Sequence, residues 1–334
     1  MRAAAIIVAF ESGPPLTRCL DALAADGVPA VVVDNGGGGP EIDEASRRAG
    51  VTVVPADGNR GYGAGCNLGA ARTDADVLVF LNPDTVVGPG AVAALARALD
   101  DPGVGAVQAR LGLLADPATL NSSGNVVHVS GLAWPGGYGD PVASVADRRE
   151  IPYASGAAFA MRAACFRDLG GFAEELFLYQ EDLELCWRAR LRGLRVLVEP
   201  GADVLHDYVL ERADRRKEYY LERNRLVFVL TAFSTRLLVL LAPVLVAVEA
   251  GIALVALRQG WLREKGRGWV WLYRNRGWLA ARRRSVQAAR QVDDRSLAGH
   301  LTPSLDPRML ALPPGIRLFN VAVAAWWRAV RVFL

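Results

Sequence analysis

Residues 77–84 read Val-Leu-Val-Phe-Leu-Asn-Pro-Asp, an apolar run that ends in a polar turn. A short apolar run bounded by turn residues is typical of a strand that is covered on both faces. Comparable runs lie at 3–10, 30–33 and 51–54, and segments with helical spacing lie at 17–25 and 64–72. This alternation predicts an α/β fold with an open, mostly parallel sheet and helices on both of its faces.

Polar residues at the ends of these strands predict where a ligand binds. The strands stop at residues 11–13 (Glu-Ser-Gly), 34–36 (Asp-Asn-Gly) and 82–84 (Asn-Pro-Asp). In open parallel sheets, ligands bind in the crevice outside the carboxyl ends of the strands. We therefore expect these polar turns to gather at one edge of the sheet and to form a binding site there.

Length and composition set the domain organisation. The chain has 334 residues and a formal net charge of +3, and this length is typical of about two domains. Its composition changes near residue 226, which predicts an α/β domain at 1–226 and a helical region at 227–334. The four cysteines have no paired or metal-type spacing, and the apolar run at 3–8 is too short for a signal peptide. We therefore expect the chain to face the cytosol.

Two segments at the predicted edge have the chemistry to bind a nucleotide. The Asp34 carboxylate follows a strand and is able to accept a hydrogen bond from a base N–H or a ribose hydroxyl. Residues 59–65 (Asn-Arg-Gly-Tyr-Gly-Ala-Gly) lead into a helix, where backbone N–H groups bind anions. The alternative is an ordinary turn at each position, since the glycines have neither Rossmann nor Walker spacing.

Asn82 and Asp84 form a candidate metal site. Hard divalent cations take oxygen ligands and keep coordination positions for substrate phosphates. Asp84 is the expected direct ligand, and the neutral Asn82 lowers the charge of the site. The alternative is a turn capped by these side chains, without a metal. His206 also ends an apolar strand, at 202–205, and is either a further ligand or a structural histidine.

Glu181 and Asp182 begin a predicted helix at 183–191. Carboxylates at this position commonly cap the helix and interact with its dipole. Two adjacent carboxylates do not point the same way, so one of them is able to cap while the other faces a pocket as a general base. The pair therefore carries both a structural and a catalytic interpretation.

Taken in order, seven segments resemble the inverting family 2 glycosyltransferases, which have the GT-A nucleotide-sugar fold. The resemblance extends over about residues 3–226, and seven segments in the right order are far more specific than any single one. The segments are 7–12, 32–36, 59–67, 80–85, 155–157, 170–182 and 204–206.

The resemblance implies a role for each matching residue. Asp34 binds the nucleoside, Asp84 and His206 hold Mg²⁺ or Mn²⁺ on the diphosphate, and Asp182 is the base, with Glu181 beside it as a positioning residue. The implied donor-binding residues are Ala9, Phe10, Glu11, Asp34, Asn59, Gly61, Asn67, Asn82 and Asp84. The expected acceptor-binding residues are Tyr153, Ser155, Gly156, Trp134 and Tyr179, together with Arg223 and Arg225, which lie just before the apolar run at 237–257 and are placed to meet acceptor phosphates.

The chain departs from the usual family pattern at Glu11, at Asn82 and in the longer glycine loop at 37–39. Asn82 is common in a subset that resembles the rhamnosyltransferases of cell-wall and surface-polysaccharide assembly, so dTDP-L-rhamnose is the first-choice donor. The alternatives are a UDP-sugar such as UDP-galactofuranose, or a non-catalytic protein that binds nucleotide sugars or glycans. Neither alternative implies a nucleic-acid partner.

The C-terminal region has the composition of a membrane-associated segment. Residues 237–257 are aliphatic and long enough to cross a bilayer, but Pro243, Glu249 and Gly251 interrupt them. A spanning helix, an interfacial helix and a buried helix of a soluble domain are therefore all open. Residues 258–290 combine ten basic residues with aromatic ones, and 317–334 is amphipathic. This pattern favours the anionic cytoplasmic face of a membrane and a polyprenyl-diphosphate-linked or glycan acceptor.

Overall fold

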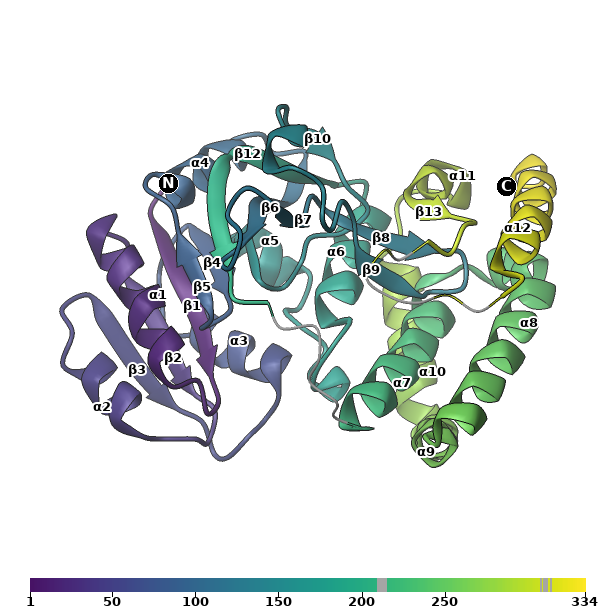
Figure 1. Ribbon diagram of the computed structural model, residues 1–334, viewed down its shortest axis with the longest axis horizontal. Coiled ribbons are helices and arrows are strands. Elements are labelled where there is room, and N and C mark those ends of the chain that lie inside the picture. Colours follow the sequence, from purple (N-terminus) through teal and green to yellow (C-terminus); the bar gives the residue numbers. More distant parts are fainter. Residues whose placement is uncertain (209–214, 307, 309–311, 313) are drawn as a thin grey trace. The chain divides into compact units, whose positions relative to one another are not determined.

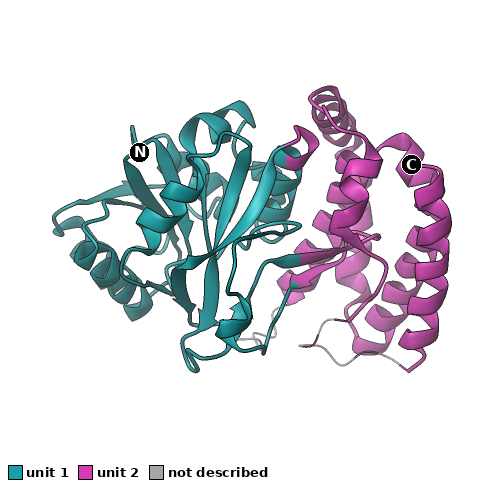
Figure 2. Ribbon diagram, turned by 90° about the horizontal axis from the view of Figure 1, so that it is seen from above, with its two compact units in different colours: residues 1–125, 135–189, 194–209 teal, residues 126–134, 190–193, 210–334 magenta. Residues whose placement is uncertain are grey.

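The computed structural model describes residues 1–208, 215–306, 308, 312 and 314–334. The chain divides into two compact units, coloured separately in Figure 2. The first comprises Met1–Asn125, Pro135–Ala189 and Leu194–Val209, and the second comprises Val126–Trp134, Arg190–Gly193 and Leu210–Leu334. The predicted boundary at 226 lies inside helix α7 (Arg215–Ala232).

A mixed sheet forms the centre of the first unit (Figure 1). Its strand order is β10-β12-β6-β11-β4-β1-β2-β3, with β5 paired to β12 and β7 paired to β6. The parallel part consists of β1 (Ala3–Ala9), β2 (Ala30–Asp34), β3 (Val51–Pro55) and β4 (Val77–Leu81). These four strands lie where the sequence predicts them. β1, β2 and β4 are short apolar runs buried on both faces, whereas β3 is the edge strand and only its Val54 is buried.

The rest of the sheet runs in both directions. Strand β11 (Ala158–Arg162) is antiparallel to β4 and to β6 (Val104–Leu113). Strand β12 (Arg195–His206) is parallel to β6 and antiparallel to β5 (Thr85–Val87). Shorter strands are β7 (Leu120–Ser122) and β10 (Arg149–Glu150). The last residue of β12, His206, is thereby paired with Thr85, which follows the 82–84 turn.

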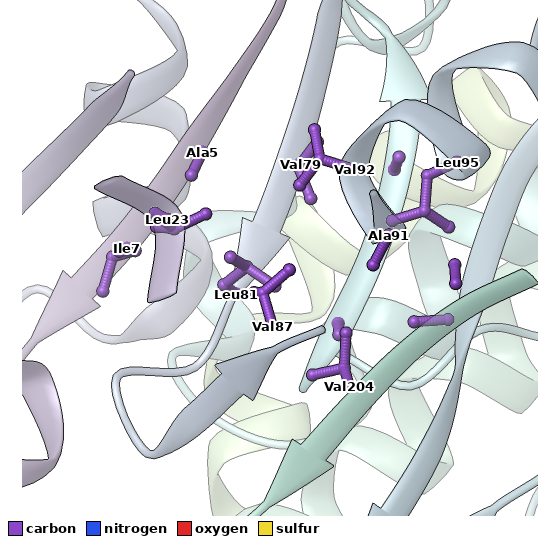
Figure 3. Packing of buried hydrophobic residues seen from close by; sticks show 14 of the residues in the cluster. Ala5, Ile7, Leu23, Val79, Leu81, Val87, Ala91, Val92, Leu95 and Val204 are labelled. Carbon is purple, nitrogen blue, oxygen red and sulfur yellow. The ribbon is translucent and has the colours of Figure 1, made fainter. Parts of the chain in front are cut away.

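Helices cover both faces of this sheet, as the sequence predicts. On one face, α1 (Pro14–Ala25) and α4 (Ala91–Ala98) bury their apolar side chains against β1 and β4 (Figure 3). On the other face, α3 (Tyr62–Ala70) approaches β1 closely, because Gly65 and Gly69 carry no side chains. A Cβ on either glycine would lie 2.7 Å from a side-chain carbon of Val8 or Ile6.

Three further helices complete the first unit. Helix α2 (Pro40–Ser46) follows the glycine loop at 37–39, and α5 (Ala163–Asp168) follows β11. Helix α6 (Glu181–Leu191) begins at the acidic pair. The sequence predicts α6, but it does not predict α2 or α4. Both missed helices are at most eight residues long, and a segment of two turns gives only a weak periodic pattern.

The second unit is mainly helical. Its helices are α7, α8 (Thr235–Gln259), α9 (Leu262–Arg274), α10 (Arg276–Ala288), α11 (Asp294–Leu297) and α12 (Ile316–Val332). A small sheet pairs β8 (Asn125–His128) with β9 (Ala133–Pro135) and β13 (Leu301–Thr302). Within the described ranges, α8 is the one helix that is long and apolar enough to cross a membrane.

A buried ion cluster joins three helices of the second unit. It consists of Glu222 and Arg225 on α7, Glu249 on α8 and Lys265 on α9. Arg225 lies 2.9 Å from Glu222 and also contacts Glu249. Lys265 Nζ lies 2.8 Å from Glu222 and 2.9 Å from Glu249. Both cations are only 1% exposed, so each depends on the two carboxylates for its compensation.

We expect Glu222→Gln to lower the free energy of unfolding of the full chain by about 3–5 kcal/mol, because two buried cations then share one carboxylate. Urea unfolding in mild detergent, followed by circular dichroism, measures this change.

The matched control is Asp21→Asn, which removes a 64% exposed carboxylate from a surface ion pair with Arg48 and costs about 1 kcal/mol or less. Equal unfolding midpoints for the two variants would contradict the structural role of the ion cluster.

Candidate active site

The carboxyl ends of the parallel strands bring several predicted residues to one edge of the sheet. Register pairs Ala9, the last residue of β1, with Asp34, the last residue of β2. Phe10 and Glu11 follow β1, and Ala9, Glu11 and Asp34 line one small pocket. Phe10 is exposed beside it.

The loop after β2 is tied to the loop before α3. Asp34 Oδ1 accepts hydrogen bonds from the backbone N–H groups of residues 36–38, at 3.1–3.2 Å. Asn35 Nδ2 donates to Asn59 Oδ1 at 3.1 Å and to the Gly61 carbonyl at 3.2 Å. The buried Asn35 therefore holds the two candidate donor loops together, although the sequence analysis gives it no role.

His206 meets Asp84 at the end of β12. The His206 Nε2 and Asp84 Oδ1 atoms are 3.3 Å apart, without the geometry of a hydrogen bond. On the other side of the ring, His206 Nδ1 lies 3.0 Å from Asn121 Oδ1. An amide oxygen only accepts, so Nδ1 donates in this contact, and Nε2 is the ring nitrogen that faces Asp84.

These atoms fit a divalent cation. Asp84 Oδ1 is buried and has no hydrogen-bond partner among the described residues, although a buried carboxylate oxygen needs one. Neighbouring ligands of an octahedral Mg²⁺ lie about 3 Å apart, close to the separation of Asp84 Oδ1 and His206 Nε2. No group of three His, Cys, Asp or Glu side chains forms a metal site in the described ranges. Asp84 and His206 would thus hold a cation together with oxygens of a substrate.

The acidic pair begins α6. Asp182 Oδ2 accepts a hydrogen bond from Gly156 N at 2.8 Å, and Asp182 Oδ1 accepts one from Leu183 N at 2.7 Å. Burial raises the pKa of Asp182 to about 6, while these backbone hydrogen bonds act to lower it. Burial, with repulsion from Asp182, raises the pKa of Glu181 well above its usual range. Burial thus favours the neutral form of both carboxyl groups, and the two backbone hydrogen bonds favour ionisation at Asp182.

Two consecutive residues link the acidic pair to the turn at 82–84. Gly156 N donates a hydrogen bond to the Asp182 carboxylate, and the carbonyl of the next residue, Ala157, accepts a hydrogen bond from Asn82 N at 2.9 Å. One dipeptide thus contacts both of the acidic segments that the sequence predicts separately.

The segment before α6 has unusual backbone angles. Phe177, Tyr179 and Gln180 have positive φ angles of 63°, 68° and 64°, a conformation that costs free energy in residues other than glycine and is common at functional sites. The Phe177 carbonyl accepts a hydrogen bond from Tyr62 N at 2.8 Å. This contact needs Gly61, because a Cβ there would lie 2.2 Å from the Phe177 oxygen.

Other predicted residues have mainly structural contacts. Asn67 Nδ2 donates to the Phe172 carbonyl at 3.0 Å, and Asn67 Oδ1 accepts from Phe172 N at 2.8 Å. Asn67 thus fixes the loop after α5. Neither of these contacts gives it a role in binding the nucleotide-sugar donor. Ser155 N donates to Gln108 Oε1 at 2.8 Å, and Tyr153 is buried beside this segment.

Three predicted acceptor residues, Trp134, Arg223 and Arg225, belong to the second unit. The structure corrects the predicted role of Arg225 in acceptor binding. Its guanidinium is held by carboxylates in the buried ion cluster and is not available to acceptor phosphates. Arg223 is buried, and its guanidinium lies 4.5–5.3 Å from the ring centroids of Tyr219, Tyr220 and Trp271.

Comparison with known proteins agrees with this geometry. Residues 2–227, more than half of the chain, match the family model described as glycosyltransferase like family 2. The chain belongs to this family.

Two curated relatives from Mycobacterium tuberculosis are each 30% identical to this glycosyltransferase. One is a pre-mycofactocin glycosyltransferase, aligned over 58% of this chain and 41% of the relative. The chain therefore spans about two fifths of that relative's length. The other is an N-acetylglucosaminyl-diphospho-decaprenol L-rhamnosyltransferase, aligned over 60% of this chain and 74% of the relative.

Two solved structures share the GT-A fold. GalNAc-T7, crystallised with UDP, GalNAc and Mn²⁺, is 17% identical with a TM-score of 0.59, over 69% of this chain and 48% of its own. The mannosyltransferase PcManGT from Pyrobaculum calidifontis, in complex with GDP-Man and Mn²⁺, is 17% identical with a TM-score of 0.51. That alignment covers 99% of this chain and 86% of the mannosyltransferase.

The contact between Gly61 and Phe177 gives a test of the site geometry. We expect Gly61→Ala to displace the Phe177 carbonyl and to lower the stability of the glycosyltransferase by more than the strain of a positive φ alone. Thermal unfolding of the purified chain measures this loss.

Gly58→Ala is the matched control. Gly58 also has a positive φ, of 74°, but an added Cβ meets nothing within 4 Å. Gly58→Ala should therefore lower the free energy of unfolding by about 1–3 kcal/mol, from backbone strain only. If the two variants unfold at the same temperature, the close approach of Phe177 to Gly61 does not constrain the site.

Proposed function

We propose that this chain is an inverting glycosyltransferase that moves L-rhamnose from dTDP-L-rhamnose to a lipid-linked acceptor in the assembly of a cell-wall or surface glycan. The observation that carries the catalytic part is Asp182, a buried carboxylate with a pKa of about 6 that two backbone N–H groups hold in place. Family membership supports the transfer of a sugar, and the residues of this site support the roles below.

Asp182 is proposed to act as the general base. Its carboxylate takes the proton of the acceptor hydroxyl while that oxygen forms a bond to the anomeric carbon of the donor sugar. The bond from this carbon to the diphosphate oxygen breaks, and the nucleoside diphosphate leaves with the electron pair. Attack from the opposite side inverts the configuration, and no covalent sugar–enzyme intermediate forms. A base whose pKa is near 6 suits this task, because it is both ionised and basic at neutral pH.

The donor is proposed to bind along the strand ends. Asp34 has one carboxylate oxygen committed to its own loop, and the other remains for the nucleoside. Asp84 and His206 are proposed to hold Mg²⁺ or Mn²⁺. A bound cation offsets the negative charge of the diphosphate and assists its departure. Both solved relatives with this fold contain Mn²⁺.

Two observations support rhamnose and a lipid-linked acceptor. Asn82 is the neutral residue of the rhamnosyltransferase-like pattern. One 30% identical relative is named for transferring L-rhamnose to a diphospho-decaprenol-linked sugar. Such an acceptor lies in a membrane, so the second unit, with its apolar α8, is proposed to bind the cytoplasmic face of that membrane. Assays against a panel of dTDP-, UDP- and GDP-sugars decide between rhamnose and alternatives such as galactofuranose.

We expect Asp182→Asn to reduce transfer by about 10²–10⁴-fold while leaving the affinity for the nucleotide sugar unchanged, because only the proton acceptor is lost. Release of nucleoside diphosphate in the presence of acceptor measures the rate, and calorimetry measures donor binding.

The control is Glu181→Gln. Because burial raises the pKa of Glu181 and favours its neutral form, the glutamine imitates that form, and transfer should stay close to that of the unmodified enzyme. The activity of the unmodified enzyme, as kcat/KM, should fall as the pH drops below about 6, where Asp182 becomes protonated. Near-normal turnover of Asp182→Asn would remove Asp182 from the role of base.

For the metal, we expect transfer to stop in excess EDTA and to return when Mg²⁺ or Mn²⁺ is added. Asn121→Ala should weaken the binding of Mn²⁺ by about 10–100-fold, because Asn121 orients the His206 ring. Electron paramagnetic resonance of Mn²⁺ with added nucleoside diphosphate measures this affinity without catalysis. Full activity in excess EDTA would exclude a cation held by Asp84 and His206 from the reaction.

A further inference from the structure

Glu249 fixes the orientation of α8 within the second unit. It lies near the middle of this 25-residue helix, about 21 Å from its start and about 15 Å from its end. Its carboxylate contacts Arg225 on α7 and Lys265 on α9. It also accepts a hydrogen bond from Trp269 Nε1 at 2.6 Å. The middle of α8 is therefore bound to two helices that carry many charges.

These contacts decide between a spanning and an interfacial helix. If α8 crossed a bilayer, Glu249 and Lys265 would lie near the middle of the hydrocarbon. Arg263 and Arg267, both exposed, lie two residues on either side of Lys265 and would enter the hydrocarbon with it. A charged side chain at this depth is strongly unfavourable. The same contacts are favourable if α8 lies parallel to the membrane surface, with α7 and α9 on its aqueous side.

The outer face of α8 is suited to such an arrangement. Its large exposed side chains fall on one stripe, opposite the buried positions Leu237, Leu241, Val244 and Val248. The stripe residues are Val239, Val246, Leu254 and Leu257, between 47% and 69% exposed. A monomeric soluble protein rarely exposes so continuous an apolar surface.

Basic residues flank this stripe at both ends of the helix. Arg236 in its first turn and Arg258 in its last turn are both exposed. Long basic side chains beside an inserted apolar face reach the phosphates of anionic lipids. Helix α12 lies beside α8, where Trp326 Nε1 donates to the Leu240 carbonyl at 2.9 Å. It has an exposed apolar stripe of its own, formed by Leu318, Val321 and Val332.

We propose that α8 docks flat into one leaflet of a bilayer containing anionic lipid, with the stripe at Val239, Val246, Leu254 and Leu257 inserted and Arg236 and Arg258 on lipid phosphates. This proposal rests on the proposed membrane attachment and deepens it, since it excludes a transmembrane helix. It is independent of the identity of the sugar and of the roles of Asp84 and Asp182.

Flotation of the full chain with lipid vesicles tests the docking surface. The unmodified protein should float with phosphatidylglycerol-containing vesicles and much less with pure phosphatidylcholine. Val246→Glu should abolish flotation, and Leu257→Glu should do the same. The matched control, Ala24→Glu, adds an equal charge to an exposed helical residue of the first unit and should float normally. Flotation of Val246→Glu like the control, or failure of the unmodified protein to float, would overturn the proposal.

Labelling with a membrane-impermeant maleimide tests the orientation. Single cysteines replace the exposed Ala24, before α8, or the exposed Ala288, after it, in a Cys165→Ser background. If α8 lies flat, both cysteines react from the same side of the membrane, in inverted vesicles but not in intact cells. If α8 spans, they react from opposite sides, and the proposal fails.

Nucleotide-sugar binding, measured by thermal shift, should be unchanged in Val246→Glu. This binding measurement therefore distinguishes a failure of the membrane proposal from a failure of the proposed transferase site.

Discussion

Two hydrogen bonds from consecutive residues hold the candidate active site together. Gly156 N binds the Asp182 carboxylate, and the Ala157 carbonyl binds Asn82 N at the start of the Asp84 turn. The position of this dipeptide is set by β11, which starts at Ala158 and pairs with the whole of β4. The antiparallel strand β11 thus links the turn at 82–84, which follows β4, to the start of α6, about a hundred residues later in the chain. Asp182 has the hydrogen bond from Gly156 N because this pairing fixes the dipeptide.

A second backbone pairing builds the candidate cation site. His206 pairs with Thr85, so the end of β12 lies beside the turn at 82–84. Asn121, in β7, then orients the imidazole ring so that Nε2 faces Asp84. The pairing positions the two candidate ligands, and the amide fixes the direction of the ring.

The buried ion cluster has a comparable role in the second unit. Three helices of mixed polarity meet at Glu222, Arg225, Glu249 and Lys265, where two carboxylates compensate two nearly inaccessible cations. Because such ions are stable only with their partners in place, the cluster fixes the rotation of α8 about its own axis. The apolar stripe lies opposite the buried positions Leu237, Leu241, Val244 and Val248 in that rotation. The same contacts occupy Arg225, for which the sequence predicts a role in acceptor binding.

The sequence by itself determined the parallel strands, the helices on both faces and the polar turns at the strand ends, because these depend on local patterns of apolar residues. Its ordered segments also predicted the family. It assigned no role to Asn35 or Asn121, because a single buried amide leaves no periodic signal. It did not predict α2 or α4, because helices this short leave no periodic signal either. Only the tertiary structure decided that burial raises the pKa of both Glu181 and Asp182 while backbone N–H groups stabilise the Asp182 carboxylate, and that Glu249 faces two cations. These properties arise from burial and from partners far away in the chain, which no local pattern records.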